Sequence, residues 1–506
     1  MFTFRSVFVR VYQAFRFYGL SGILMGVGFL WPVFWLLVVP GVALFLYASL
    51  AATTWRQAIF GSFITFTLKA LFAIAWFWTT YPIVWIELPL GAMELPVVGF
   101  SWLTVGAGIG LAGAVLGGAL WLLRSRVQPR WWLAVLPPLW LGTEILGSFF
   151  FSIFTIGEGG TLNTVFSFGY IGYLLANHAW LLMLAQWGGV YILSLISVAL
   201  GVGIWLWWGR SGQALTRKQL ERIIMAGLLI AITTPFFTTL IADRMDKEKI
   251  TVAIIDTTFG GEDFFSLSER DSYKREQIIE ALAVALETEA DYVVLPEDSR
   301  YLNPALAPER AYSFFRFEQG DPRAVVIEAG RVPYEAGAVL RVSIYDGIEK
   351  KAYGIDKQYL VPQGEFMPYL YTTTLQFLGG GKTASALEAK LKYRPGPLYE
   401  QSKLPKHLPG VLFCFASANP LAVYDLIEER ELPFIVHPIS HAWFHSPDSL
   451  WQQLDVMLKI HAVWNNVPIV SAGNMVEGAL YTEAGAKVIG ETYARGASWR
   501  VSLVSW

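Results

Sequence analysis

Cysteine is almost missing from this chain: Cys414 is the single one among 506 residues. An intrachain disulfide and a cysteine metal cluster each need more than one thiol, so both are excluded. Three histidines, His437, His441 and His445, lie near one another in the sequence without a carboxylate companion at metal-ligand spacing. We therefore predict no metal site and no cofactor. Cys414 remains either a buried structural thiol or a reactive one.

An excess of basic residues is also missing. The 38 Lys and Arg residues are balanced by 40 Asp and Glu residues, which gives a net charge of -2. No basic stripe with interleaved aromatic residues occurs, so we expect no nucleic acid partner. No G-x-S-x-G motif occurs either, so a serine hydrolase of that kind has no visible nucleophile.

Hydrophobic residues, by contrast, are abundant: they make up 54% of the chain, and the mean hydropathy is +0.45. A helix needs about 20 apolar residues to cross a bilayer. Apolar runs predict seven such spans, near residues 17–31, 33–51, 58–80, 99–123, 131–150, 179–208 and 223–242. The first two are expected to form a tight hairpin around Trp31 and Pro32, and one long kinked helix is the alternative.

The basic residues of the first half indicate how the spans are oriented, because Lys and Arg concentrate in cytoplasmic loops. They cluster before the first span and after the second, fourth and sixth, and the alternate loops have none. Seven spans with a cytoplasmic N-terminus satisfy this pattern and place everything after Asp243 outside the cytoplasm. Because many spans follow the basic N-terminus, we interpret it as a retained helix and not as a signal peptide.

Two charged residues, Lys69 and Glu144, fall inside predicted spans. A charge is costly there unless it faces a partner, a cavity or the lipid headgroups. The sequence leaves open whether the two have a paired structural role or contact lipid headgroups.

The pattern changes from Lys249 onward, where short apolar strands alternate with amphipathic helices. Strands are predicted at 250–256, 291–297, 410–415, 433–438 and 467–473, and helices at 272–290, 421–431 and 449–465. This β-α-β order is typical of an α/β domain whose strands are buried on both faces. We therefore predict two domains, a membrane α-helical bundle over 1–245 and an α/β domain over 246–506.

Three segments of the second domain place a reactive side chain at or just beyond the end of an apolar strand, where α/β folds build sites. They are VVLPED with Glu297, YGIDKQYLVPQGEFMP with Lys357 and Glu365, and GVLFCFAS with Cys414. A thiol is mostly protonated at neutral pH, so a nucleophilic cysteine needs a base and a nearby cation. Glu297 can take the proton, and Lys357 can stabilise a thiolate and an oxyanion. Glu365 can orient Lys357 or share the role of base, so the set predicts acyl transfer through a thioester.

The motifs LPE, DK-x-x-LVP-x-GE-x-x-P and an apolar strand ending in cysteine, in this order, resemble the carbon-nitrogen hydrolase (nitrilase) superfamily. Together with the N-terminal spans, they make the chain similar to the apolipoprotein N-acyltransferase family. The resemblance implies a nitrilase-like α-β-β-α sandwich with Glu297, Lys357 and Cys414 as the catalytic residues and Glu365 in support. The HAWFHSPDSLWQQ segment also fits the family, and its Trp443 and Phe444 are candidates for lipid or substrate contact or for plain packing.

The activity implied by this resemblance is acyl transfer from a membrane phospholipid, through the cysteine, to the N-terminal amine of a diacylglyceryl lipoprotein. The implied location is the bacterial inner membrane, with the catalytic domain on its extracytoplasmic side. The chain departs from the family at Phe415 and Ala416, where Tyr and Glu are usual, and at Gln363, where Phe is usual. The family's final span after the hydrolase domain is not found. Two alternatives stay open: a membrane-tethered amidase or nitrilase, and a non-catalytic lipid-binding or lipoprotein-binding relative.

Overall fold

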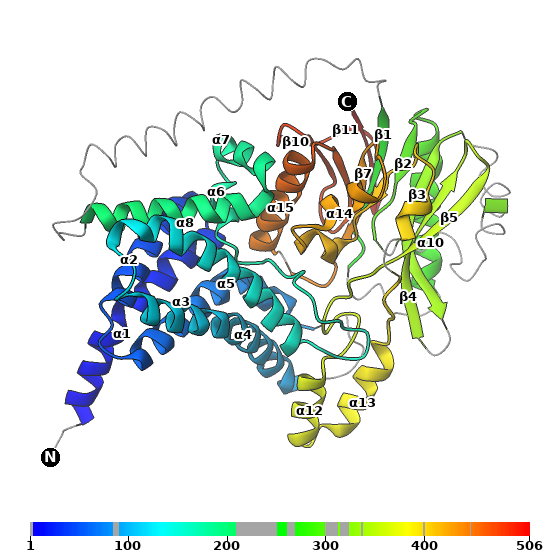
Figure 1. The fold of residues 1–506 in the computed structure, drawn as a ribbon. Helices are drawn as coiled ribbons and strands as arrows, with labels where there is room; N and C mark the ends of the chain where they lie inside the picture. Colours follow the sequence, from blue (N-terminus) through cyan, green and yellow to red (C-terminus); the bar gives the residue numbers. More distant parts are fainter. Residues whose placement is uncertain are drawn as a thin grey trace.

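A helical region and an α/β region lie side by side in the computed structural model of this chain (Figure 1). The structure describes residues 4–83, 91–208, 250–260, 269–297, 299, 312–313, 323–334, 337–397, 400–445 and 447–506. The predicted span at 223–242 lies outside the described residues. Among those that are described, four helices are long and apolar enough to cross a membrane: Pro32–Leu50, Glu94–Leu123, Pro129–Phe154 and Gly189–Trp207.

Six long helices make up the described part of the helical region. They are α1 (Phe4–Gly26), α2 (Val38–Leu50), α3 (Trp55–Ala73), α4 (Glu94–Leu123), α5 (Trp132–Phe154) and α8 (Gly189–Trp208). The hydroxyl of Tyr18 in α1 donates to the carbonyl of Ala48 in α2 over 3.2 Å, and Ser21 donates to Gly41 over 2.8 Å. These contacts run in opposite order along the two helices, so α1 and α2 form the predicted hairpin and not one kinked helix.

Helix α4 packs closely on α3 through a row of glycines. Gly106, Gly110, Gly113 and Gly117 share one face of α4, and a Cβ added at any of them would collide with α3. Because apolar burial drives little association between helices in lipid, small residues that permit close backbone approach are typical of such interfaces. The row therefore fixes α4, whose N-terminal end lines the cavity described below.

The predicted span at 179–208 is shorter than expected, because the helix that crosses the bundle begins only at Gly189. Gly188 and Gly189 have φ angles of 159° and 60°, and Gly189 lies against Trp464, where a Cβ would come within 2.2 Å of the ring. The left-handed backbone at Gly189 suits glycine and ends the preceding short helices, α7 (Ala179–Leu182) and the 3-10 turn Met183–Trp187.

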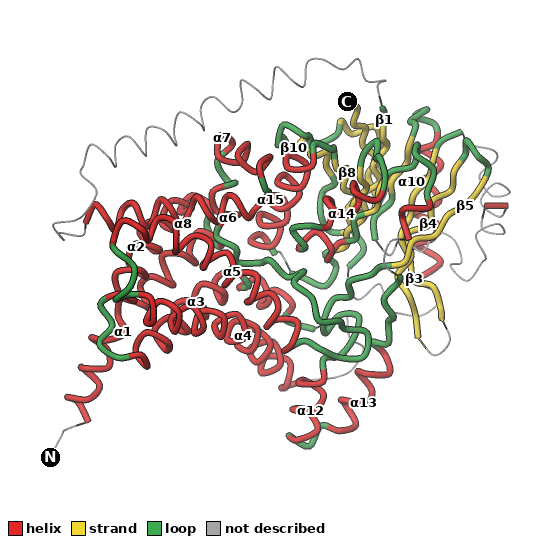
Figure 2. The backbone as a smooth tube through the Cα atoms, viewed as in Figure 1, coloured by secondary structure: helices red, strands yellow, loops and turns green. Residues whose placement is uncertain are grey.

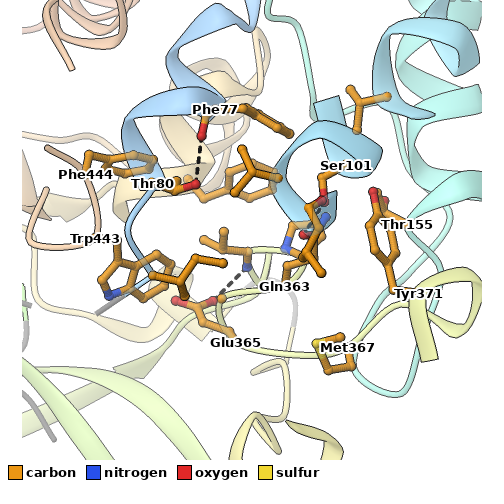
Figure 3. Close-up of a pocket in the computed structure, with 18 of the residues that line it drawn as sticks. Phe77, Thr80, Ser101, Thr155, Gln363, Glu365, Met367, Tyr371, Trp443 and Phe444 are labelled. Carbon is orange, nitrogen blue, oxygen red and sulfur yellow. Dashed lines mark hydrogen bonds between the residues drawn. The ribbon is translucent and has the colours of Figure 1, made fainter. Parts of the chain in front are cut away.

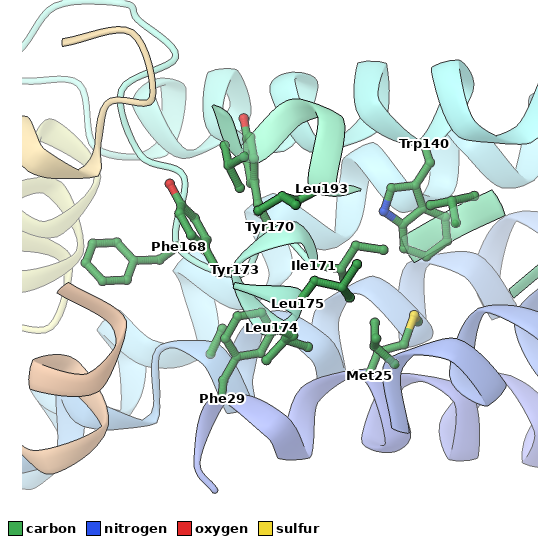
Figure 4. Close-up of a cluster of buried hydrophobic side chains, with 14 of the residues drawn as sticks. Met25, Phe29, Trp140, Phe168, Tyr170, Ile171, Tyr173, Leu174, Leu175 and Leu193 are labelled. Atoms are coloured by element: carbon green, nitrogen blue, oxygen red, sulfur yellow. The ribbon is translucent and has the colours of Figure 1, made fainter. Parts of the chain in front are cut away.

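A buried segment from residue 165 to 175 passes between the helices, and Figure 4 shows Tyr170, Ile171 and Tyr173 among the side chains of the bundle core. Lys69 donates to the carbonyl of Gly169 over 2.8 Å and lies 3.6 Å from Glu144. Glu144 also accepts from the backbone N–H of Ile171 over 2.8 Å. Both charged side chains are buried, so the structure gives them the paired role and not a contact with headgroups.

The α/β region contains two sheets. The first has the order β11–β12–β1–β2–β3–β4–β5, and the second has the order β6–β7–β8–β9–β10. Among the described residues, one pair links them into a continuous 12-stranded sheet: Thr257 at the end of β1 and Asn474 at the end of β8. The strands of the first sheet are β1 (Thr251–Thr257), β2 (Tyr292–Val294), β3 (Val325–Tyr334), β4 (Gly337–Asp346), β5 (Lys351–Asp356), β11 (Glu491–Arg495) and β12 (Trp499–Ser505). Those of the second are β6 (Gly410–Val411), β7 (Ile435–Ser440), β8 (Ile469–Asn474), β9 (Ala479–Tyr481) and β10 (Lys487–Val488).

The side chains that alternate along the strands show that the two sheets are stacked. In β1, Val252 and Ile254 share a core with Val436 and Val470 of the second sheet, whereas the alternate residues Ala253 and Ile255 face the other way. Helix α10 (Glu269–Leu286) covers the outer face of the first sheet. Helices α14 (Ala422–Glu429) and α15 (Asp448–Asn465) cover that of the second, as Figure 2 shows. The predicted α-β-β-α sandwich is thereby confirmed, and burial on both faces explains the nearly continuous apolar runs of the strands.

Helix α15 also joins the two regions. Leu458 and Ala462 pack on the second sheet, and Leu454 and Met457 belong to the core that includes the membrane helices. The side chain of Gln453 donates to the carbonyl of Ala73 at the end of α3 over 2.8 Å. The α/β region is therefore fixed on the end of the bundle at which α3 ends.

Candidate active site

A cavity of about 430 Å³ lies between the two regions, and its lining is mostly apolar. The helical region contributes Trp76 and Phe77 after α3, the start of α4, and Phe151 and Thr155 at the end of α5. The α/β region contributes the four residues that the sequence singled out for chemistry: Glu297, Lys357, Glu365 and Cys414. Figure 3 shows part of this wall, with Glu365, Trp443 and Phe444 on one side and Ser101 and Tyr371 on the other.

Lys357 is the centre of the polar group. It is 1% exposed, and its Nζ lies 2.6 Å from Glu365 Oε1 and 3.1 Å from Glu297 Oε1. Burial by itself would lower the pKa of Lys357, but the charges of Glu297 and Glu365 outweigh burial and raise that pKa. The side chain therefore stays an ammonium ion beside the two carboxylates.

Cys414 begins the 3-10 turn Cys414–Ala418, three residues after Val411, the last residue of strand β6. It is half-buried and borders the cavity. Burial and then the negative charge of Glu297 raise the pKa of the Cys414 thiol, although Lys357 and the backbone of Ser440 lower it. The resting thiol is therefore protonated, and an attack by sulfur requires Glu297 or another base to take the proton.

Glu365 is held by a tight turn that begins at Val361. The backbone N–H of Glu365 donates to the carbonyl of Val361 over 2.9 Å, and the backbone N–H of Val361 donates to Glu365 Oε2 over 2.8 Å. One carboxylate oxygen is thus used by the turn and the other by Lys357. This arrangement fits an orienting role for Glu365 better than a shared role as base.

Trp443 and Phe444 both line the cavity. The Trp443 ring lies against Gly364, where a Cβ would come within 2.2 Å of it, and Phe444 makes an edge contact with Trp76 over 5.6 Å between ring centroids. Both residues therefore pack within the wall and also face the space where a ligand would lie.

The sequence did not predict that the segment after α5 would contact the 3-10 turn Cys414–Ala418. Ser167 donates to the carbonyl of Ala418 from its backbone N–H over 3.2 Å and from its hydroxyl over 2.5 Å. Its neighbours Phe166 and Phe168 line the cavity. Because 251 residues separate the two partners along the chain, no local pattern could have indicated this contact.

Three histidines near the turn Cys414–Ala418 and strand β7 are buried. His461 contacts the carbonyl of Ser417 over 3.0 Å, and His437 and His441 lie in and just after β7. Burial lowers the pKa of His437 and of His441 to about 3 and that of His461 to about 4. All three are therefore neutral at physiological pH. His445 instead contacts Pro82 at the helical region over 2.9 Å.

These shifts predict that acid destabilises the protein. Below pH 6.5 the unfolded chain binds protons that the folded chain excludes, so this stability is present above pH 6.5 and is lost as the pH falls toward 4. We expect the free energy of unfolding to fall by about 2 kcal/mol per histidine between pH 6.5 and pH 5. Unfolding in detergent at a series of pH values, with His461→Gln for comparison, measures this. A pH-independent free energy of unfolding in that window, in the wild type, would contradict the assignment.

One group in the described part of the chain could hold a metal ion: Asp346, Glu349 and His407 place ligand atoms within 4.8 Å of one another. Asp346 is already bound to His407 over 2.8 Å and to two backbone N–H groups, and Glu349 is bound to Tyr353. The group lies at the β4–β5 turn, at the opposite end of β5 from Lys357. These three side chains therefore form a hydrogen-bonded network that stabilises the β4–β5 turn, away from the cavity.

Known proteins were found that test the resemblance seen in the sequence motifs. No family model matches the chain. Apolipoprotein N-acyltransferase of Prochlorococcus marinus (strain MIT 9313) is 25% identical over 383 residues, which cover 72% of this chain and 66% of that protein. The chain thus spans just under two thirds of the length of this curated relative.

Solved structures of two smaller proteins align with half of the chain. A CN-hydrolase superfamily protein of Xanthomonas campestris is 13% identical and covers 51% of this chain and 91% of its own, with a TM-score of 0.32. Nit3 of Saccharomyces cerevisiae, a nitrilase superfamily member, is also 13% identical and covers 51% and 90%, with a TM-score of 0.35. The curated match confirms the resemblance found in the motifs: this chain is similar, over most of its length, to apolipoprotein N-acyltransferase.

Proposed function

We propose that this protein is an N-acyltransferase that moves an acyl chain from a membrane phospholipid, through a thioester on Cys414, to the N-terminal amine of a diacylglyceryl lipoprotein. The observation that carries the proposal is the position of the candidate nucleophile. Cys414 lies at the wall of an apolar cavity built jointly by membrane helices and by the α/β region. An enzyme for a small soluble amide has no need of such a wall, whereas a lipid substrate does.

The chemistry balances with the residues present. Glu297 takes the proton of Cys414 as its sulfur attacks the ester carbonyl of the phospholipid, and Lys357 stabilises the oxyanion that forms. Collapse breaks the ester bond, and the departing glycerol oxygen receives the proton from Glu297 and leaves as a lysophospholipid. The lipoprotein amine then attacks the thioester and gives its proton to Glu297. The carbon–sulfur bond breaks, and Cys414 recovers its proton while the amide leaves.

The charge distribution of the bundle supports an extracytoplasmic site. Arg56 lies in the first turn of α3, and Arg124 and Arg126 follow α4, at the ends of these helices remote from the cavity. Arg124 also donates to the carbonyl of Ala52 on that side. Since Lys and Arg concentrate on the cytoplasmic side, the α/β region then lies outside, at the bacterial inner membrane. This is the location at which lipoprotein N-termini would be accessible.

A synthetic peptide that carries diacylglyceryl-cysteine with a free α-amine tests the acceptor. Incubated with the full chain in phospholipid vesicles, the peptide should gain one acyl group in amide linkage. Cys414→Ser should produce no such product, and a peptide with an acetylated amine should remain unmodified in both reactions. Release of free fatty acid without peptide modification, or hydrolysis of a small amide without phospholipid, would instead support the membrane-tethered amidase. No turnover of either kind, with lipid binding intact in the wild type and in Cys414→Ser, would support the non-catalytic relative.

A further inference from the structure

The cavity wall contains a small uncharged polar cluster that the chemistry above does not use. It consists of Ser101 in α4, Gln363 in the turn that holds Glu365, and Tyr371 in α12 (Tyr369–Phe377). Ser101 donates to Gln363 Oε1 over 2.8 Å. Figure 3 shows the Tyr371 hydroxyl on the side of Ser101 and Thr155, and the surroundings are otherwise mostly apolar.

The unsatisfied group of the cluster is the Tyr371 hydroxyl. The Ser101 hydroxyl already has two carbonyl acceptors, Gln363 Oε1 and the Val97 carbonyl of its own helix, each 2.8 Å away. Tyr371 is 4% exposed. Its hydroxyl makes no hydrogen bond of good geometry, although the side chains of Ser101 and Gln363 lie next to it. Burial raises the pKa of Tyr371 to about 12, so its donor proton is retained.

A buried donor without an acceptor is costly, and a ligand that brings an acceptor removes that cost. Because the cluster carries no charge, a neutral acceptor suits it better than a phosphate does. The apolar side chains beside it, such as Phe100 and Leu375, would accommodate an alkyl chain next to that acceptor. A carbonyl oxygen attached to a long alkyl chain has both properties.

The backbone at Gln363 links this cluster to the candidate catalytic residues. Gln363 has a φ of 66°, which is uncommon for a residue other than glycine, and such backbone is often found at functional sites. Glu365 follows two residues later and binds Lys357, so the two backbone positions lie within about 7 Å of each other. One turn therefore serves both the ammonium group of Lys357 and the polar cluster.

We propose that Ser101, Gln363 and Tyr371 form a subsite for the ester carbonyl of the acyl chain that the phospholipid donor retains. The inference rests on the function proposed above. While Cys414 attacks one ester of the glycerol backbone, the second ester, on the neighbouring glycerol carbon, receives a hydrogen bond from this cluster. The cluster thereby selects diacyl lipids and aligns the attacked ester with Cys414.

Lipids with a single ester test the subsite. Formation of the acyl-enzyme is measured by mass for a diacyl phospholipid and for the two regioisomers that carry one ester and one ether chain. The regioisomer from which the acyl-enzyme still forms shows which of the two chains is transferred. In the wild type, we expect kcat/KM for this regioisomer to be about tenfold lower than for the diacyl lipid, because the ether chain lacks the carbonyl that would bond to the buried donor.

Gln363→Leu and Tyr371→Phe, placed on separate elements, should each lower the rate with the diacyl lipid toward that with the ether lipid and leave the ether rate nearly unchanged. Thr374→Val is the matched control, because Thr374 also lines the cavity but its hydroxyl bonds to the carbonyl of Leu370 in its own helix. It should keep the tenfold ratio. Equal rates for the ester and ether lipids in the wild type would overturn the subsite and leave the proposed function intact, as would an equal fall for both lipids in the two variants. No acyl-enzyme from any lipid would overturn the proposed function itself.

Discussion

Replacing Lys357 by methionine should lower the rate of acyl-enzyme formation by about 10³-fold, because the removal of one oxyanion-stabilising donor from a buried site has effects of that order. The Lys357 ammonium lies 2.6 Å from Glu365 and 3.1 Å from Glu297. Without this ammonium group, the oxyanion would form beside the two buried carboxylates, and none of these site residues would supply a cation. The rate is measured by rapid quenching and mass spectrometry of the protein mixed with phospholipid.

The control for this variant is Lys351→Met, at the start of β5, the strand that Lys357 directly follows. Lys351 begins β5, and its side chain is 65% exposed in its contact with Glu349. Exposed pairs contribute little, so this change should leave the rate and the stability nearly unaltered. If Lys357→Met retained a rate within tenfold of the wild type, the role assigned to the ammonium would be wrong.

The second large effect is expected on stability, at the buried pair inside the bundle. Lys69→Met removes the donor to Gly169 and the partner of Glu144, whose Oε2 atom already lacks a hydrogen bond among the described residues. Removing one member of a buried pair typically costs about 3–5 kcal/mol, because the other charge is left unpaired. We expect a loss of that order in the free energy of unfolding, measured by reversible unfolding in detergent or lipid.

The double variant Lys69→Met with Glu144→Gln separates charge from packing. Glutamine keeps an acceptor for the Ile171 N–H and brings no charge, so the double variant should be more stable than Lys69→Met alone. The pair also holds the segment that carries Phe166 and Phe168 to the cavity and Ser167 to the turn Cys414–Ala418. A double variant that is less stable than Lys69→Met would show that the charge of Glu144 is not what destabilises the single variant.

Only part of the second half of the fold could be predicted from the sequence: the elements with strong local signals were found, whereas β3 to β5 and β9 to β12 were not, and the strand predicted at 410–415 is only Gly410–Val411. Apolar strands and amphipathic helices alternate from Lys249, and β1, α10, β7, α15 and β8 lie close to their predicted positions. The three site segments were found because each follows an apolar strand, and strand ends meet at one edge of a sheet. The structure places Glu297, Lys357 and Cys414 at one cavity; their catalytic roles remain predictions.

What the sequence could not predict depends on contacts between distant residues. The hydrogen bond from Ser101 to Gln363 joins positions 262 residues apart, and nothing in either segment indicates the other. The start of α8 was placed too early, because an apolar run does not show that Gly189 turns the backbone against Trp464. Lys69 and Glu144 could be recognised as unusual in a span, but only the fold shows that they are partners.

The most direct test of the account is the mass of the intact protein after incubation with a phospholipid of defined acyl chains, followed by peptide mapping. We expect one added acyl group, located on the peptide that contains Cys414, absent from Cys414→Ala and removed when a diacylglyceryl-cysteinyl peptide is added. A wild-type protein that gains no acyl group, or an adduct that persists in Cys414→Ala, would contradict it.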